Sequence, residues 1–299
     1  MASRRSSKRY VKRKSTGRKK RSYVRSTRKR TYRRKTMTKR SILNTTSKKK
    51  RDTMLPWTNM TASSQSGSTT YTTSPAVITG GVSLAPMIIW CATARDMTPN
   101  SVPSAPGYIA TRTATSCYMK GLSEKIEIQI SDGLPWQWRR ICFTSKAFVD
   151  EVTTTGSFSL FNETSDGMQR AINQPTGANR TAVERSLFKG EVNVDWNDQM
   201  IAPLDRARFT VMYDKTITIA AGNESGSIRK YNRYHPMNKT LVYNDEERGD
   251  TEESAYYSVG SKAGMGDYYV VDIFRPRVGS TTSNQLLFSP NTTLYWHEK

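Results

Sequence analysis

The first 51 residues of this chain contain no aspartate and no glutamate, and the first acidic residue is Asp52. The same stretch holds 24 of the 47 Lys and Arg residues. The remaining 248 residues carry the other 23 basic side chains and all 25 acids, which is a net charge of −2. The total of +22 is therefore a cationic arm joined to a nearly neutral body, and such an arm needs a polyanionic partner.

The arm also has few large aliphatic side chains. They are Val11, Val24, Met37, Ile42 and Leu43. Burying so few side chains cannot offset the entropy lost on ordering the backbone, about 1–2 kcal/mol per residue. We therefore expect residues 1–52 to be a disordered basic arm.

Long hydrophobic runs are missing throughout. The longest apolar stretch, Val82–Ala92, is too short to cross a bilayer and contains Pro86. The basic N-terminus is not followed by the apolar segment of a secretory signal, so we predict no membrane insertion. Three cysteines without a CxxC pair predict reduced, buried thiols in a cytosolic or nuclear protein; they are Cys91, Cys117 and Cys142.

Histidine is equally scarce, with only His235 and His297 in the chain. The sequence has no HExxH, no phosphate-binding P-loop, no GxSxG and no Cys/His spacing typical of a metal site. We therefore predict a protein that is not an enzyme and that needs no metal and no cofactor.

One acidic cluster, residues 244–253, leaves three alternatives open. It could be a solvated loop, it could bind arginines of a neighbouring subunit, or it could gather a divalent cation. The side chains in question are Asp245, Glu246, Glu247, Asp250, Glu252 and Glu253.

The body is rich in strand patterns. From Leu122 to Ile130 the apolar residues and Glu124 fall on one face, with polar residues on the other. Asp132-Gly133 then predicts a tight turn, and a second alternating segment follows from Trp136 to Phe143.

Further strands are predicted within Val183–Trp196, in Arg208–Ala220 with a bend at Asp214-Lys215, in Lys239–Tyr243 and in Asp267–Arg275. Residues 146–180 are expected to be an ordered excursion between strands. The Ser/Thr-rich residues 53–75 are expected to be a linker with anchoring points, of which Pro56-Trp57 is one possible contact with the body. The prediction for residues 76–299 is an all-β jelly-roll sandwich of two antiparallel sheets.

Arg139 and Arg140 stand beside Trp136 and Trp138. An arginine next to an indole could stack on an unpaired base. Alternatively, the tryptophans lie in the core and the arginines pair with acids such as Glu124 or Glu127. The sequence favours the core for the tryptophans and leaves both alternatives open for the arginines.

The cations of the arm predict binding to phosphates without sequence preference, together with nuclear import. The predicted nucleic-acid-binding residues are Arg4, Arg5, Lys8, Arg9, Lys12, Arg13, Lys14, Arg18, Lys19, Lys20, Arg21, Arg25, Arg28, Lys29, Arg30, Arg33, Arg34, Lys35, Lys39, Arg40, Lys48, Lys49, Lys50, Arg51, Arg139 and Arg140.

Three strings of the body resemble the capsid proteins of genomoviruses, the gemycircularvirus group. They are "IIWCATARDM" (Ile88–Met97), "CYMKGLSEKIEIQISDGLPWQWRRICFT" (Cys117–Thr144) and "YHPMNKTLVYNDEE" (Tyr234–Glu247). Within the last, "HPMNKTLVY" is also similar to a strand of geminivirus coat proteins. The arm resembles the family only in its composition.

This resemblance implies a jelly-roll capsid protein that self-assembles into a small T=1 icosahedral virion around circular single-stranded DNA, formed in the host nucleus. About 60 copies with 24 cations each would place on the order of 1,400 charges inside, which suits a genome of roughly one to three thousand nucleotides. Host nuclear import receptors are further expected partners.

Two other functions remain open. A ribosomal or chromatin-type scaffold protein would also carry a basic extension. A metal-dependent nuclease could use the acids between Asp245 and Glu253.

Overall fold

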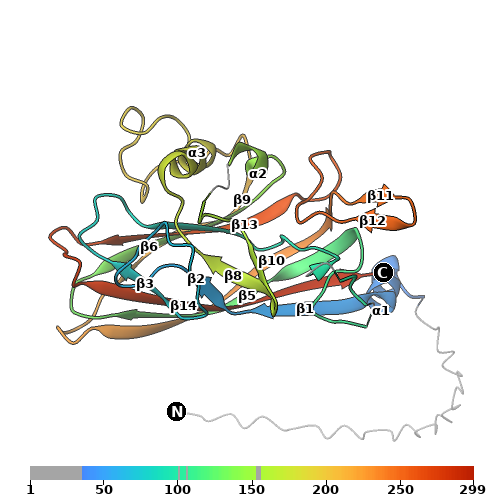
Figure 1. The fold of residues 1–299 in the computed structure, drawn as a ribbon, viewed down its shortest axis with the longest axis horizontal. Helices are drawn as coiled ribbons and strands as arrows, with labels where there is room; N and C mark the ends of the chain where they lie inside the picture. Colours follow the sequence, from blue (N-terminus) through green and yellow to red (C-terminus); the bar gives the residue numbers. More distant parts are fainter. Residues whose placement is uncertain (1–35, 100–101, 106, 153–155) are drawn as a thin grey trace, which may run out of the picture. The chain divides into compact units, whose positions relative to one another are not determined.

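A computed structural model describes residues 36–99, 102–105, 107–152 and 156–299. The chain divides after Ile42, and residues 43–299 form the second, compact unit. The second unit is an all-β sandwich of two antiparallel sheets, as the alternating patterns predict (Figure 1).

The first sheet contains the strands that alternate most clearly. Its order is β1 (Lys48–Met54), β14 (Gln285–Glu298), β5 (Ser116–Ile130) and β10 (Ser227–Val242), and β3 (Ala76–Thr79) pairs with the other end of β14. Along β5 every second residue is buried, with Leu122, Glu124 and Ile126 on the inner face as predicted.

Most of the second sheet is buried on both of its faces, and its edge strand, Thr210–Ile219, is largely exposed. Its order is β4 (Met87–Cys91), β13 (Asp267–Pro276), β6 (Trp136–Ser145) and β9 (Thr210–Ile219). In β13 the first eight residues are all buried, and in β4 all five are. Such continuous burial is typical of a strand covered on both sides.

The chain passes repeatedly between the two sheets, and this order of strands is that of a jelly roll. The turn between β5 and β6 contains Asp132-Gly133. There the Oδ1 atom of Asp132 accepts a hydrogen bond from the backbone amide of Leu134 at 2.8 Å. Gly226 precedes β10 with φ +79°, and a Cβ there would lie 2.1 Å from the carbonyl oxygen of Ile130. Only glycine fits so close to the neighbouring strand.

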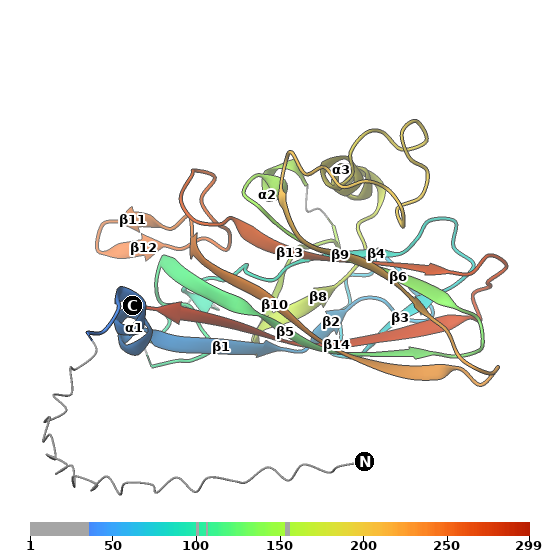
Figure 2. The ribbon, with the colours of Figure 1, turned by 180° about the vertical axis from the view of Figure 1, so that it is seen from behind.

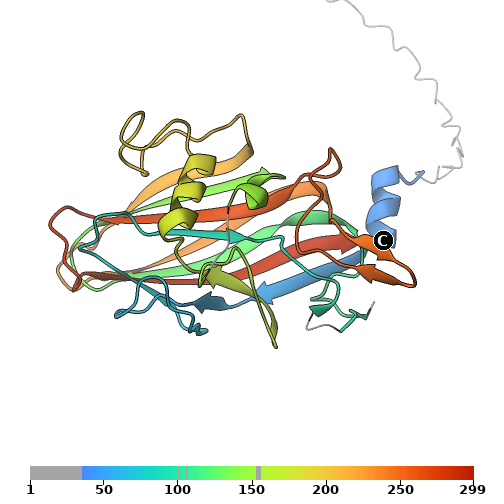
Figure 3. The same ribbon diagram turned by 45° about the horizontal axis from the view of Figure 1, so that its top comes forward.

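An ordered excursion joins β6 to β9, as expected for this long segment. It contains α2 (Phe148–Glu151), β7 (Asn162–Thr164), β8 (Gly167–Ile172) and α3 (Gly177–Leu187). The two helices lie on the side of the second sheet that faces away from the first sheet (Figures 1 and 3). Buried Phe148, Val183 and Leu187 pack there with Phe143 and Tyr269 of the sheet.

The remaining elements are short. The strand β2 (Pro56–Thr58) pairs with β8, and β11 (Glu246–Arg248) forms a hairpin with β12 (Thr251–Glu253). In the part of the chain that is described, no helix has the length and apolar character needed to cross a membrane.

The predicted boundary of the arm at residue 52 is wrong. A helix, α1, spans Lys39–Thr46, and residues 48–52 belong to β1, which pairs with the whole C-terminal half of β14. The edge of a sheet supplies hydrogen bonds that composition cannot reveal, so a run of basic residues can still form a strand. Residues 1–35, which carry most of the predicted arm, lie outside the described residues.

The segment predicted to be a linker, residues 53–75, contacts the body at Pro56-Trp57 as expected, where β2 pairs with β8, and it is anchored at further points. Met54 and Met60 are buried in the core, and the Thr58 hydroxyl donates to the carbonyl of Ile172 at 2.9 Å. Trp57 and Tyr71 stack with their ring centroids 6.4 Å apart. A few anchors of this kind order a Ser/Thr-rich segment, although its average composition is typical of a flexible one.

Two of the strand predictions need correction. Val183–Trp196 contains the end of α3 and irregular structure in place of a strand. The bend predicted at Asp214-Lys215 is absent, and the register of β9 against β6 shifts next to Met212 instead. The strand predicted at Lys239–Tyr243 is confirmed for residues 239–242, although that strand, β10, begins much earlier, at Ser227.

Candidate nucleic-acid interface

Most of the predicted nucleic-acid-binding residues, those from Arg4 to Lys35, lie outside the described residues. Lys39 and Arg40 begin α1, and Lys39 is exposed. On β1, Lys48, Lys49 and Arg51 are exposed and can reach an anionic partner.

Lys50 is not available for phosphate, and its prediction as a nucleic-acid-binding residue is wrong. Its side chain is buried, and Nζ lies 3.0 Å from Glu298 Oε2 and 2.8 Å from the carbonyl oxygen of Thr111. Burial raises the pKa of Glu298, but hydrogen bonds from Thr113, Trp296 and Lys50 outweigh that effect and hold the pKa below its usual value. In strand β1 the alternation of the backbone turns this one lysine inward.

Arg140 is likewise buried between the two sheets. Its Nε and Nη2 donate to the two oxygens of Asp272 at 2.7 and 2.9 Å, and Nη1 donates to Glu124. Burial alone would raise the pKa of Asp272, yet the charge of Arg140 holds it below its usual value. The prediction that Arg140 binds nucleic acid is therefore wrong, and the alternative pairing with Glu124 is confirmed.

A second arginine completes this buried cluster. Arg170 of β8 donates to Asp272 at 2.8 Å, and Thr292 of β14 donates to Glu124 at 3.1 Å. With Arg140, the cluster holds two positive and two negative side chains, so no net charge is buried. Because Glu124 lies in the first sheet and Asp272 in the second, these ion pairs join the two layers.

Arg139 points to the opposite side of β6 and is also paired. It forms a bidentate ion pair with Asp214 at 2.9 and 2.8 Å, and Nη1 donates to the carbonyls of Gln199 and Ala202. Arg139 therefore fixes the excursion onto the second sheet, and its predicted role in nucleic-acid binding is wrong. Trp136 and Trp138 are fully buried, which confirms their predicted place in the core.

The acidic cluster is divided between two environments. Asp245 accepts two hydrogen bonds from Arg112, at 2.5 and 2.9 Å, and Arg112 lies 3.8 Å from the ring centroid of Tyr243. Burial raises the pKa of Asp245, but the hydrogen bonds from Arg112 and the Ala255 amide, together with the charge of Arg112, outweigh it and hold the pKa below its usual value. Asp245 is thus already bound within its own chain, which corrects its prediction as a subunit contact.

The other acids of the cluster remain at the surface. The Thr115 hydroxyl donates to Glu252 at 2.8 Å. Residues 246–253 of the β11–β12 hairpin are exposed, including Glu246, Glu247, Asp250 and Glu253. Within the described residues, no group of three or more His, Cys, Asp or Glu side chains is arranged to hold a metal ion.

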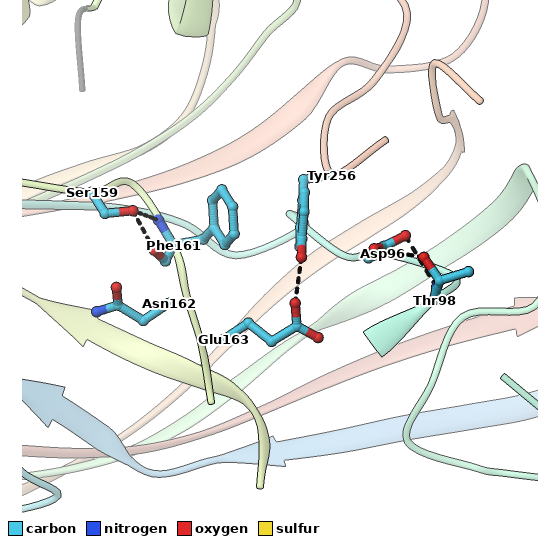
Figure 4. Close-up of a pocket in the computed structure, with 7 residues that line it drawn as sticks. All are labelled: Asp96, Thr98, Ser159, Phe161, Asn162, Glu163 and Tyr256. Carbon is cyan, nitrogen blue, oxygen red and sulfur yellow. Dashed lines mark hydrogen bonds between the residues drawn. The ribbon is translucent and has the colours of Figure 1, made fainter. Parts of the chain in front are cut away.

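A polar hollow of about 470 Å³ lies next to β7 (Figure 4). The rings of Phe161 and Tyr256 stack at 4.3 Å, and the Tyr256 hydroxyl donates to Glu163. Asp96 also lines the hollow, where its own loop residue Thr98 donates to it at 2.9 Å. The lining carries negative charge, so this hollow does not suit phosphate.

Positive charge collects instead on the outer face of the first sheet, the layer formed by β1, β14, β5 and β10 in Figure 2. The strand registers place Lys49, Arg51, Lys125 and Lys230 on this face. Among the described residues of these four strands, Glu127 is the only acid that shares the face, and it pairs with Lys230 at 3.2 Å.

One end of this face has the highest density of cations. Burial lowers the pKa of His297, and the nearby charges of Lys49 and Lys120 lower it further. Lys120 occupies an irregular position in β5, where the register against both neighbouring strands shifts. Apart from Lys49 and Arg51, sequence reasoning missed these cations, because each is a single residue in an ordinary alternating strand.

Searches against protein-family models and against curated proteins found no match to this chain.

Proposed function

We propose that this chain is the shell-forming subunit of a small icosahedral particle that packages circular single-stranded DNA. The observation that carries the proposal is the segregation of charge on a jelly-roll chain, with 24 cations in the first 51 residues and a net charge of −2 in the rest. The resemblance of three strings of the body to genomovirus capsid proteins supports the same function.

The charge distribution also supports a mechanism. Binding of many cations to phosphates releases counterions, so affinity is high, independent of sequence and steeply dependent on salt. A nearly neutral body lets neighbouring subunits approach without strong repulsion. DNA then screens the arms from one another, which couples packaging to assembly.

The surface of the body supports repeated contacts between subunits. Leu84, Ile201 and Val278 are exposed apolar side chains that line one hollow of about 720 Å³. They come from the loop before β4, the excursion and the loop after β13. Clustered apolar side chains of this kind mark protein contact surfaces.

The buried polar groups of the body serve its architecture in this proposal, and the protein has no catalytic role. Arg139, Arg140 and Lys50 fix strands and loops to one another. Asp245, one of the acids that the nuclease hypothesis would use, is bound to Arg112.

Electron microscopy of the purified protein, with and without nuclease treatment, tests the proposal. We expect closed particles of uniform size that protect single-stranded DNA from digestion. Monomers or small complexes that bind structured RNA or duplex DNA would contradict it and would favour a ribosomal or chromatin-type scaffold. Digestion of added single-stranded DNA in Mg²⁺ or Mn²⁺ would favour a nuclease.

A further inference from the structure

The cationic end of the first sheet also carries aromatic rings on its outer face. Tyr118 of β5 and Tyr234 of β10 are 38% and 52% exposed, unusually open for aromatic side chains in strands. Tyr295 and His297 of β14 are partly exposed on the same face. Four rings from three strands thus lie together, although they are up to 179 residues apart in sequence.

The backbone of β5 is shaped to hold one of these rings. A Cβ on Gly121 would lie 2.7 Å from Oη and 2.8 Å from Cζ of Tyr234, so the tyrosine ring rests directly on this glycine. The Tyr234 hydroxyl donates to the carbonyl of Lys120 at 3.4 Å. Because Tyr295 is the register partner of Gly121 on the opposite side, Tyr234 reaches across β5 toward Tyr295.

The other two rings form a second pair one step along the sheet. Tyr118 and His297 are register partners, and their ring centroids are 6.1 Å apart with a tilt of 40°. Lys49 is the register partner of His297 on the other side, and Arg51 that of Tyr295. Each aromatic pair therefore has a cation next to it on β1.

This combination matches the chemistry of an unpaired nucleic-acid strand. Exposed rings on a flat sheet offer stacking surfaces for bases, and flanking lysines and arginines bind the phosphates between them. Glu127, the one acid on this face, lies farther along β5 and is paired. A duplex keeps its bases stacked inside and presents no free base face to such a surface.

We propose that this face is a base-stacking platform for single-stranded DNA, formed by Tyr118, Tyr234, Tyr295 and His297 with Lys49, Arg51, Lys120 and Lys125 around them. The inference rests on the proposed function and deepens it, because it adds a contact to bases that the phosphate-binding arm does not supply. It predicts a preference for strands that carry bases over strands that carry phosphates alone.

The test uses the full-length chain and two fluorescent 20-mers with the same number of phosphates, oligo-dT and an abasic strand. Fluorescence anisotropy at about 0.3 M salt, where phosphate contacts are weakened, measures both dissociation constants. We expect the wild type to bind oligo-dT at least about tenfold more tightly than the abasic strand.

Two double variants distinguish the contribution of the aromatic rings from that of the tyrosine hydroxyls. In Tyr118→Ala/Tyr234→Ala the preference for oligo-dT is expected to fall to about twofold or less. Tyr118→Phe/Tyr234→Phe keeps both rings and is expected to retain it. Circular dichroism melting confirms that each variant is folded, and both substituted positions are exposed, so neither removes a core side chain.

Photo-crosslinking of the wild type to a strand that contains 5-iododeoxyuridine gives a second readout that needs no variant. Crosslinks in peptides of residues 116–123, 231–237 or 293–299 are expected. Crosslinks confined to residues 1–47, equal binding of both strands, or an unchanged preference in the alanine variant would overturn the platform and leave the arm's role intact. Failure of the wild type to bind either strand would refute the proposed function as well.

Discussion

The two sheets of the sandwich differ in what covers them. The second sheet is buried on both faces along β4, β13 and β6, by the first sheet on one side and by α2, α3 and their loops on the other, whereas its edge strand β9 is largely exposed. The first sheet is buried on its inner face only, and its outer face carries cations and exposed rings.

Their sequences differ accordingly. The second sheet contains the continuous apolar run of β13, interrupted by Asp272, whereas β5 and β14 alternate between apolar and polar residues. In the shell subunit that we propose, these two patterns separate two tasks. The sealed sheet keeps the subunit rigid, and the open sheet is free to bind a ligand.

The largest expected effect on stability comes from disrupting the buried ion pairs between the two sheets. Arg140→Leu leaves Asp272 and Glu124 with less compensating charge, and we expect the free energy of unfolding to fall by about 3–5 kcal/mol. Urea unfolding measures it. Lys125→Ala, an exposed cation of the open face, is the matched control and should change stability by less than about 0.5 kcal/mol. Equal losses from both substitutions would contradict the comparison.

The next effect concerns His235, whose buried ring lies against Tyr213 at 5.1 Å. Burial lowers the pKa of His235 to about 4, so as pH falls below about 6.5 the unfolded chain takes up a proton that the folded chain does not. Between pH 7 and pH 4.5 this group therefore removes stability. His235→Gln should make the loss smaller by about 2–3 kcal/mol, measured by urea unfolding at both pH values.

Asp267 is expected to change stability with pH in the opposite direction to His235, so it provides the control. Burial raises the pKa of Asp267 to about 6, so the folded chain binds this proton first and gains stability as pH falls through that value. Asp267→Asn should therefore steepen the loss of stability in acid. The same acid dependence in the wild type and in both variants would show that neither group titrates as described.

A smaller effect compares neighbouring lysines of β1. Lys49→Ala removes a cation of the open face, and we expect the slope of log affinity for single-stranded DNA against log salt to become shallower by about 1. Lys50→Met removes the buried partner of Glu298 and should lower stability without changing that slope. A changed slope for Lys50→Met in a folded protein would show that the inward lysine reaches DNA after all.

The smallest effect on stability is expected in the β11–β12 hairpin. Glu246→Gln/Glu247→Gln removes two exposed charges, so the free energy of unfolding should change by less than about 0.5 kcal/mol. If the hairpin contacts a neighbouring subunit, particle yield falls while the fold is kept. Electron microscopy and size-exclusion chromatography measure the yield. An unchanged yield would show that the hairpin makes no contact needed for assembly.

Much of the fold could be predicted because alternation is a local signal. The inward position of Glu124 and the two faces of β6 follow from a period of two residues. The ion pair of Arg140 with Asp272 could not be predicted. Alternation places Arg140 inward, but it does not reveal that Asp272, 132 residues later, lies opposite.

The candidate site was harder to predict for the same reason. In the run of basic residues from Lys48 to Arg51, only the register against β14 distinguishes buried Lys50 from exposed Lys49. Tyr118 and Tyr234 meet only because β10 pairs with β5, and a single tyrosine in a strand gives no local signal for binding. Gly121 interrupts the alternating pattern of the sequence, but nothing in the sequence shows that the ring of Tyr234 packs against it.

Deletion of residues 1–38 tests the central claim most directly. It removes 18 of the 24 cations of the first 51 residues but keeps α1 and β1, whereas a deletion through residue 51 would remove part of the first sheet. The measurement is the dissociation constant for single-stranded DNA at about 0.15 M salt, compared with that of the full chain. The account predicts a folded protein whose affinity is at least about a hundredfold weaker. Equal affinity of the two proteins would contradict it.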